Sequence, residues 1–110
     1  MLVVLRFEAT GDVFLEEAGE ALRILAARPG FRGGQVARAY DQPELWCLVT
    51  EWESVGAYRR ALGSFEVKAA ATPLLSRALP QPSAFEPLLV ADPGAPVQAL
   101  SSDRSLGSRP

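Results

Sequence analysis

The side chains best suited to chemistry gather around Trp52, which two carboxylates flank in the sequence. Glu51 precedes the indole, Glu53 follows it, and Tyr58 lies a short distance further along the chain. A buried carboxyl group with a raised pKa can act as a general base, and a phenolic hydroxyl can donate to a bound oxygen atom. The structural alternative makes Glu53 a solvated residue near a helix start and Tyr58 part of a helix stripe. Both interpretations depend on the elements that hold these residues.

The composition excludes several kinds of site. The 110 residues include no histidine and no asparagine, so the sequence holds no Ser-His-Asp triad in its usual form and no His/Cys cluster for zinc. The net charge is −2 and the arginines are scattered, which disfavours a nucleic-acid partner. We predict that the single cysteine, Cys47, is a reduced and buried thiol, because it lies within an apolar run.

The N-terminal segment Met1–Arg6 is apolar, with no basic region before its apolar residues and no cleavage-site pattern. It therefore predicts a strand and not a signal peptide. No apolar stretch in the sequence reaches the about 18 residues that a membrane span needs. We expect a cytoplasmic protein without a membrane partner.

Hydrophobic periodicity and turn residues predict the elements that position the candidate residues. Strands are expected at residues 2–8, 31–40 and 45–53, with a fourth contained in the segment 82–90, and helical regions at 12–28 and 54–79. Asp12 and Ser54 are the expected N-caps of the two helical regions. The pair Gly33-Gly34 predicts a bulge or a close backbone approach in the second strand. Pro87 predicts an edge position or an irregular exit for the fourth strand.

The end of the chain has a different composition from the rest. Residues 92–110 are rich in Pro, Gly and Ser and show little apolar pattern. They are predicted to form a flexible tail that follows a single domain at residues 1–91.

The element order β-α-β-β-α-β predicts an α+β fold of the ferredoxin-like type, with an antiparallel four-stranded sheet and helices on one face. The opposite face would carry an apolar patch that one chain leaves bare: Leu2, Val4, Val36, Cys47, Val49 and Leu88. We expect two copies to pair through this face and share the patch, forming a homodimer. Arg6, Arg38 and Glu51 would lie on the same surface or its rim, where they serve either interface ion pairing or catalysis.

A family resemblance rests on three segments in this order: Pro29-Gly30-Phe31-Arg32-Gly33-Gly34, the turn Asp41-Gln42-Pro43-Glu44, and Glu51-Trp52-Glu53-Ser54. The chain resembles the antibiotic biosynthesis monooxygenase family, whose members are small dimeric α+β barrels. The resemblance covers residues 2–90. It implies a ligand pocket between the sheet and the helices, with Trp52 on its wall.

The resemblance also implies a set of site residues. The expected catalytic residues are Trp52, which would wall the pocket, Tyr58, which would position an oxygen atom, and Arg6, which would stabilise an anion. The expected pocket lining comprises Phe7, Phe31, Trp46, Thr50 and Phe65. Such an aromatic lining suits a flat, apolar, partly oxygenated ligand. The same aromatic face can equally form an ordinary hydrophobic core.

Two reactions characterise the resembled family. Oxidative haem cleavage there uses a histidine as iron ligand with an asparagine nearby, and this chain has neither residue. Cofactor-independent oxygenation of anthrone- or quinol-like compounds needs an apolar cavity, a base and donors for an oxyanion. Without histidine the base would be a carboxylate, and the candidates nearest Trp52 are Glu51, Glu53 and Glu66.

We therefore predict a cofactor-independent monooxygenase that acts on an aromatic polyketide-like or quinol substrate, with no metal and no organic cofactor. Two alternatives on the same scaffold stay open. One is a non-oxidative polyketide cyclase or lyase, which needs a shaped apolar cavity and little acid–base apparatus. The other is a catalytically silent dimer that binds a small ligand, which the absence of histidine and asparagine favours.

Overall fold

The structure is a computed structural model that describes residues 1–102. Its elements, in chain order, are β1 (Leu2–Glu8), α1 (Gly11–Ala26), β2 (Phe31–Arg38), β3 (Leu45–Trp52), α2 (Val55–Gly63), α3 (Phe65–Ala70), α4 (Thr72–Leu75), β4 (Ala84–Phe85), β5 (Leu89–Val90) and β6 (Gln98–Ala99). Within residues 1–102 no helix combines the length and the apolar character needed to cross a bilayer.

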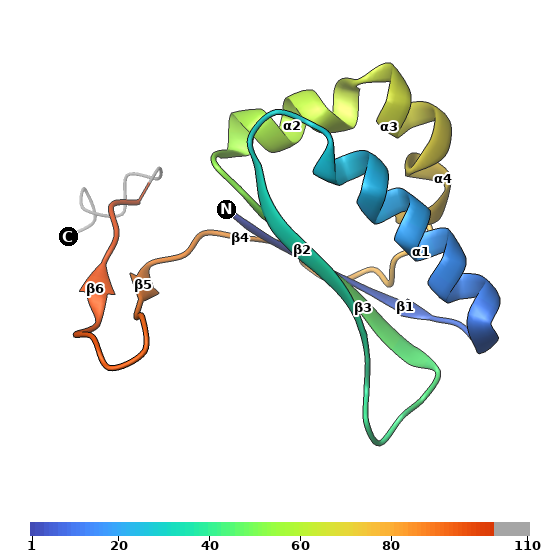
Figure 1. The fold of residues 1–110 in the computed structure, drawn as a ribbon, viewed down its shortest axis with the longest axis horizontal. Helices are drawn as coiled ribbons and strands as arrows, with labels where there is room; N and C mark the ends of the chain where they lie inside the picture. Colours follow the sequence, from blue (N-terminus) through green and yellow to red (C-terminus); the bar gives the residue numbers. More distant parts are fainter. Residues whose placement is uncertain (103–110) are drawn as a thin grey trace.

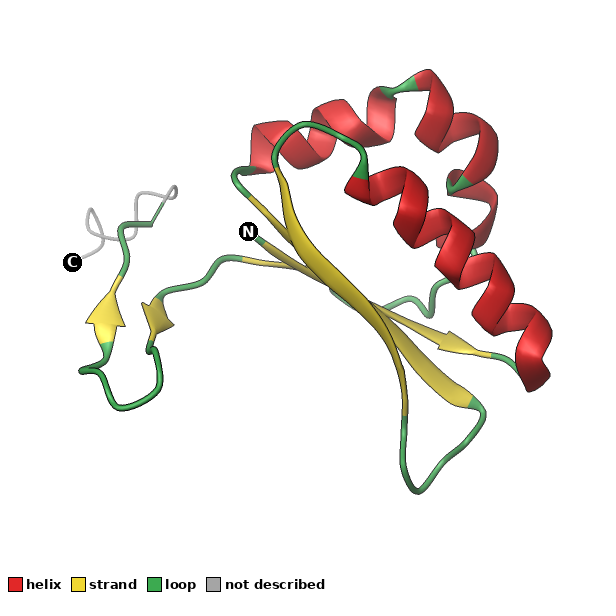
Figure 2. Cartoon of the chain, in the orientation of Figure 1, coloured by secondary structure: helices red, strands yellow, loops and turns green. Residues whose placement is uncertain are grey.

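The main sheet is antiparallel and has the strand order β2-β3-β1-β4. Its two central strands, β1 and β3, pair along their whole length, from Leu2 opposite Glu51 to Glu8 opposite Leu45. Helices α1 to α4 cover one face of the sheet and leave the other face open (Figure 1 and Figure 2). This is the α+β, ferredoxin-like arrangement that the sequence predicts.

The core lies between the central strands and the helices. Because side chains alternate along a strand, one face of β1 and β3 is buried: Val3, Phe7, Trp46, Leu48, Thr50 and Trp52. The stripe of α1 that meets this face consists of Phe14, Ala18, Ala21, Ile24 and Leu25. The predicted stripe is confirmed, except that Ile24 is buried and Leu22 only partly so.

A β-bulge changes which face the second strand presents. In the pairing of β2 with β3, Phe31 lies opposite Trp52 and Gly33 lies opposite Glu51, so Arg32 is the extra residue. The glycine pair of this strand predicts the irregularity, which is confirmed. An extra residue reverses the alternation of every side chain that follows it.

Val36 and Arg38 consequently face the helices, and their predicted place on the open face is wrong. Val36 pairs with Leu48 and packs against the core. Arg38 pairs with Trp46, and its guanidinium carbon lies 5.3 Å from the centre of that indole ring. Cys47, predicted to be buried, is only half-buried, because it lies on the face that no helix covers.

The helix starts differ from one another in how they are capped. The Ser54 hydroxyl accepts a hydrogen bond from the backbone nitrogen of Ala57 at 3.0 Å, which confirms Ser54 as the N-cap of α2. The prediction that Asp12 caps α1 is wrong, because the helix already begins at Gly11 and Thr10 occupies the N-cap position. Asp12 instead lies in the first turn, where its charge still suits the positive end of the helix dipole.

The C-terminal part of the fold departs most from the prediction. The segment 82–90 does contain the fourth strand, at the edge of the sheet, but β4 is short: it pairs with β1 over two residues and ends at Phe85. β5 pairs instead with β6, which lies in the segment predicted to be a tail. This small hairpin stands apart from the helices, beyond the end of the sheet where the N-terminus lies (Figure 1). Residues 103–110 of the predicted tail lie outside the described residues.

Candidate functional site

Trp52 ends strand β3 in a set of close aromatic contacts. Its ring centre lies 5.3 Å from that of Phe31, edge to face, and 5.4 Å from that of Tyr58. Its indole Nε1 donates a hydrogen bond to Thr50 Oγ1 at 2.8 Å. Only 1% of the Trp52 surface is exposed. These contacts fix the ring in one orientation between the sheet and α2.

A second aromatic cluster fills the space between the other end of the sheet and α1. The ring of Phe14 lies 5.2 Å from Phe7 and 5.2 Å from Trp46, centre to centre. The Trp46 Nε1 donates to the backbone oxygen of Ala9 at 3.1 Å. All three rings are buried and belong to the hydrophobic core. Phe7 and Trp46 therefore pack as core residues, with a shallow pocket of about 250 Å³ beside Phe7 and Phe14.

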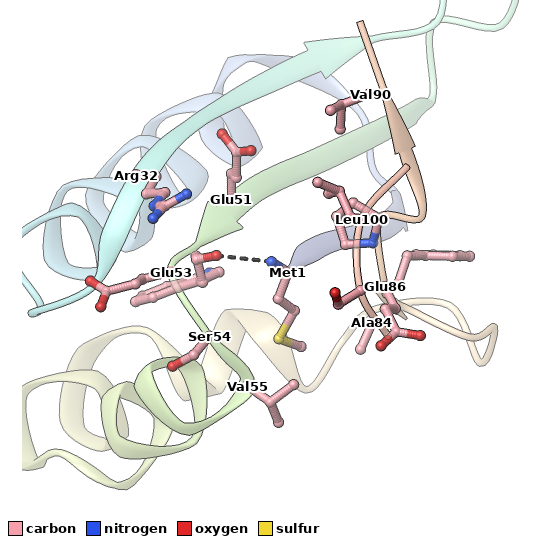
Figure 3. A pocket seen from close by; sticks show the side chains of 14 residues that line it. Met1, Arg32, Glu51, Glu53, Ser54, Val55, Ala84, Glu86, Val90 and Leu100 are labelled. Carbon is pink, nitrogen blue, oxygen red and sulfur yellow. Dashed lines mark hydrogen bonds between the residues drawn. The ribbon is translucent and has the colours of Figure 1, made fainter. Parts of the chain in front are cut away.

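A second pocket, larger than the one beside Phe7, lies at the Trp52 end of the sheet and has a volume of about 600 Å³. Its apolar lining consists of Met1, Trp52, Val55, Ala84, Phe85, Pro87, Val90 and Leu100. Its polar lining consists of Arg32, Glu51, Glu53, Ser54, Glu86 and Ser101. Figure 3 shows side chains of the sheet on one side of this space and of the C-terminal segment on the other. The pocket is thus a different space from the one predicted between sheet and helices.

Backbone hydrogen bonds hold the strand ends that form the pocket floor. The nitrogen of Met1 donates to the Trp52 oxygen at 2.9 Å, and the Trp52 nitrogen donates back to the Met1 oxygen at 2.8 Å (Figure 3 shows the first of these). The Glu53 nitrogen donates to the Gly30 oxygen at 2.8 Å. A rigid floor of this kind keeps the side chains that point from it in fixed positions.

Charged side chains on the sheet side of the pocket come from neighbouring strands. The bulge brings Arg32 close to Glu51. Arg32 is the extra residue of β2, and the next residue, Gly33, pairs with Glu51 of β3. Neither Arg32 nor Glu51 forms an ion pair within residues 1–102, and both are exposed. Glu66, a predicted base, does not line this pocket; it accepts a hydrogen bond from Arg28 at 3.2 Å.

The predicted catalytic residues do not all meet at one place. Trp52 lines the larger pocket, although its exposed area is very small. Tyr58 is half-buried behind Trp52 and is not among the lining residues. Arg6 points to the open face, where its Nη1 donates to Gln81 Oε1 at 3.3 Å. Phe65, predicted to line the pocket, is 80% exposed at the start of α3.

Burial raises the pKa of the Tyr58 hydroxyl above its ordinary value, so this group is a neutral donor at physiological pH. No group of three histidine, cysteine or carboxylate side chains within residues 1–102 is arranged to hold a metal ion. The side chains around the pocket offer hydrogen bonding, charge stabilisation and proton transfer by carboxylates.

Sequence reasoning missed Arg32 and the two hairpin residues Val90 and Leu100, which the structure places on the pocket wall. The glycine pair after Arg32 carried a usable signal, since a bulge re-aims the side chain at the extra position. No local pattern marks Val90 or Leu100, because their place depends on where the chain travels after Pro87.

Comparison with known proteins identifies the family of this chain. Residues 7–73 match the family model described as antibiotic biosynthesis monooxygenase. This match includes β2, β3 and the Trp52 segment on which the resemblance rests. None of the curated proteins matches the sequence.

Solved structures with the same fold share little sequence with it. SnoaB from Streptomyces nogalater, a cofactor-independent oxygenase, superposes with a TM-score of 0.63 at 20% identity, over 96% of this chain and 94% of its own. Rv0793 from Mycobacterium tuberculosis superposes with a TM-score of 0.59 at 17% identity, over 93% of this chain and 95% of its own. A conserved protein from Methanosarcina mazei superposes with a TM-score of 0.60 at 21% identity, over 76% of this chain and 84% of its own. With the family match over 7–73, the chain belongs to the antibiotic biosynthesis monooxygenase family.

Proposed function

We propose that this protein is a cofactor-independent monooxygenase that oxidises an aromatic, electron-rich substrate of the anthrone or quinol type. Membership of the monooxygenase family supports an oxygenase-like function. SnoaB, which shares the fold, is a cofactor-independent oxygenase. The observation that carries the proposal is the pocket of about 600 Å³ at the Trp52 end of the sheet.

The pocket suits a flat aromatic ligand in size and in lining. Small-molecule pockets commonly measure about 300–1,000 Å³ and combine apolar walls with a few polar groups. Here apolar side chains from three parts of the chain, such as Met1, Val55 and Leu100, surround a polar side formed by Arg32 and Glu51. A tricyclic ring system can lie against the apolar walls while a hydroxyl or carbonyl oxygen meets the polar side.

The reaction class needs little beyond proton transfer and anion stabilisation. Loss of a proton turns an anthrone or quinol into an electron-rich anion that reacts with molecular oxygen itself. For an anthrone, one oxygen atom becomes the new carbonyl and the other leaves as water, so no external reductant is required. The protein supplies an apolar environment, a base and a group that stabilises the anion.

We also propose that two copies pair through the open sheet face. The apolar side chains of this face are half-buried in a single chain: Leu2, Val4, Cys47 and Val49. Sharing this surface between two copies removes it from water. Glu51 lies on the same face, so the second copy would also reduce the exposure of the pocket to solvent.

A second function, binding of a small aromatic ligand without turnover, is favoured by the filled space between sheet and helices. Phe7, Phe14 and Trp46 occupy that space, where the resembled family would hold its ligand. Ligand binding in the larger pocket without oxygen consumption would support this alternative.

Oxygen consumption tests the proposal directly. The protein is freed of metals and flavins, and dissolved oxygen is followed with a panel of anthrones and hydroquinones. We expect consumption above the spontaneous rate. An anthrone should give a quinone that carries one oxygen atom from molecular oxygen, whereas a hydroquinone should give its quinone with hydrogen peroxide and no new oxygen atom. Binding of the panel without consumption would favour the silent alternative, and conversion without oxygen would favour a cyclase or lyase.

A further inference from the structure

The bulge of β2 puts a cation and a carboxylate side by side on the pocket wall. Arg32 is the extra residue of the bulge, and Gly33, which follows it, faces Glu51 across the sheet. In Figure 3 the two side chains rise from neighbouring strands on the same side of the sheet. A bulge of this kind commonly re-aims a side chain beside a functional site.

Neither of these two charged groups has an ion-pair partner within residues 1–102. The ion pairs there join Arg23 with Glu20, Arg28 with Glu66, and Arg77 with Glu17. Arg32 and Glu51 belong to none of them and make no side-chain hydrogen bond there. Exposed charges that line a pocket without partners are free to meet a ligand.

The pocket wall that lies across from Arg32 and Glu51 carries apolar side chains. Val90 and Leu100 of the C-terminal hairpin face Arg32 and Glu51 across the space (Figure 3). A ligand between the two walls would therefore have one apolar side and one side that meets a guanidinium and a carboxylate. Electrostatic interactions strengthen in such a place when water is displaced.

We propose that Glu51 is the proton acceptor of the pocket and that Arg32 holds the anion that proton transfer creates. This inference rests on the proposed function and names the groups that perform its first step. The Glu51 carboxylate takes the hydroxyl proton of a quinol, or of the enol form of an anthrone, and the O–H electron pair stays on the substrate oxygen. The guanidinium of Arg32 then donates hydrogen bonds to that oxyanion, and the proton leaves Glu51 to water when the product departs.

The chain contains no histidine that could accept the proton. In this pair the carboxylate accepts the proton and the guanidinium stabilises the anion that results. Two further carboxylates, Glu53 and Glu86, line the same pocket, and Glu86 has other partners. The test must therefore separate Glu51 from these neighbours by substitution.

The probe is alizarin, a hydroxyanthraquinone whose anion absorbs at a longer wavelength than its neutral form. Bound alizarin is titrated from about pH 5 to about pH 9, a range in which ordinary carboxylates are ionised. We expect the wild-type protein to lower the pKa of bound alizarin by about one unit through the positive charge of Arg32. Arg32→Gln should abolish this lowering and, because Glu51 remains, leave the pKa of bound alizarin at or above that of the free dye. Arg32→Lys should retain part of the lowering.

Glu51→Gln should act in the opposite direction. The Glu51 carboxylate opposes a neighbouring anion, so its removal should lower the pKa of bound alizarin below the wild-type value. Arg59→Gln and Glu66→Gln, at positions outside the pocket, are the matched controls and should titrate like the wild type. Unchanged thermal unfolding of all variants shows that each one folds.

The proposal is overturned if wild type and Arg32→Gln titrate alike, if Glu51→Gln leaves the dye unchanged, or if the wild type binds no dye. The titration needs no oxygen turnover. A correct pattern without oxygen consumption would therefore reject the oxygenase function alone, while consumption without the pattern would assign proton handling to other residues.

Discussion

Trp52 Nε1 donates a hydrogen bond to Thr50 Oγ1 over 2.8 Å, and both side chains are buried on the helix-facing side of β3. Residues two apart on a strand point to the same face, so the bond forms within one strand and needs no partner from a helix. The bond gives the buried indole N–H of Trp52 a hydrogen-bond acceptor at the pocket floor. The orientation of the indole therefore depends on a hydroxyl that the sequence places two residues before it.

Thr50→Val should destabilise the protein by about 1–3 kcal/mol, because it leaves a buried indole N–H without its acceptor. Urea unfolding measures the change. Thr50→Ser, which keeps the hydroxyl, should lose clearly less stability. Equal losses in the two variants would mean that the methyl group of Thr50 matters and the hydrogen bond does not.

Gly30→Ala should cost about 1–3 kcal/mol through backbone strain and overlap. Gly30 has φ +88°, and a Cβ built there would overlap the Cβ of Ala57. Gly33→Ala is the matched control, since its Cβ would meet no atom within 4 Å and its φ is not in the left-handed region. Thermal unfolding compares the two, and equal melting temperatures would contradict the close approach of Gly30 to α2.

Tyr58 should make stability fall at high pH. Burial raises the pKa of its hydroxyl in the folded state, so its contribution is present below the unfolded value of about 10 and is lost as pH rises through the folded value. Urea unfolding from about pH 8 to about pH 11 should show a shallower decline for Tyr58→Phe than for the wild type. Tyr40→Phe removes an exposed hydroxyl and should leave the decline unchanged.

Much of the fold is predictable because its signals are local. Alternation along β1 and β3, the helical stripe of α1 and the cap at Ser54 each lie within a few residues of sequence. Even the bulge has a local sign in its two glycines. Its consequence is harder to see, since one extra residue moved Val36 and Arg38 from the predicted face to the other.

The candidate site was only partly predictable, because it depends on packing between distant segments. Trp52 was located by its motif, but whether rings such as Phe7 and Trp46 border a cavity or fill a core depends on the helix that covers them. Phe65 fits the predicted lining by type and is exposed in the fold. The wall formed by Val90 and Leu100 depends on the path of the chain after Pro87, which residue spacing in the sequence does not predict.

Val49→Asp should turn the proposed dimer into a monomer. Val49 lies at the centre of the open sheet face, where a carboxylate would be buried without a partner in the paired state. Light scattering after size-exclusion chromatography gives the mass in solution. Val13→Asp, at an exposed position on α1, is the control and should leave the mass unchanged. A wild-type protein that is monomeric at all concentrations would contradict pairing through this face.

The central claim is that oxygenation takes place in the pocket at the Trp52 end of the sheet. Oxygen consumption with dithranol, an anthrone, tests it when wild type is compared with Leu100→Trp, which fills the pocket, and Val97→Trp, which enlarges a hairpin side chain outside it. We predict a loss of at least about tenfold in kcat/KM for Leu100→Trp, equivalent to about 1.4 kcal/mol, and wild-type activity for Val97→Trp. Full activity in both variants, or no consumption by the wild type, would contradict the account.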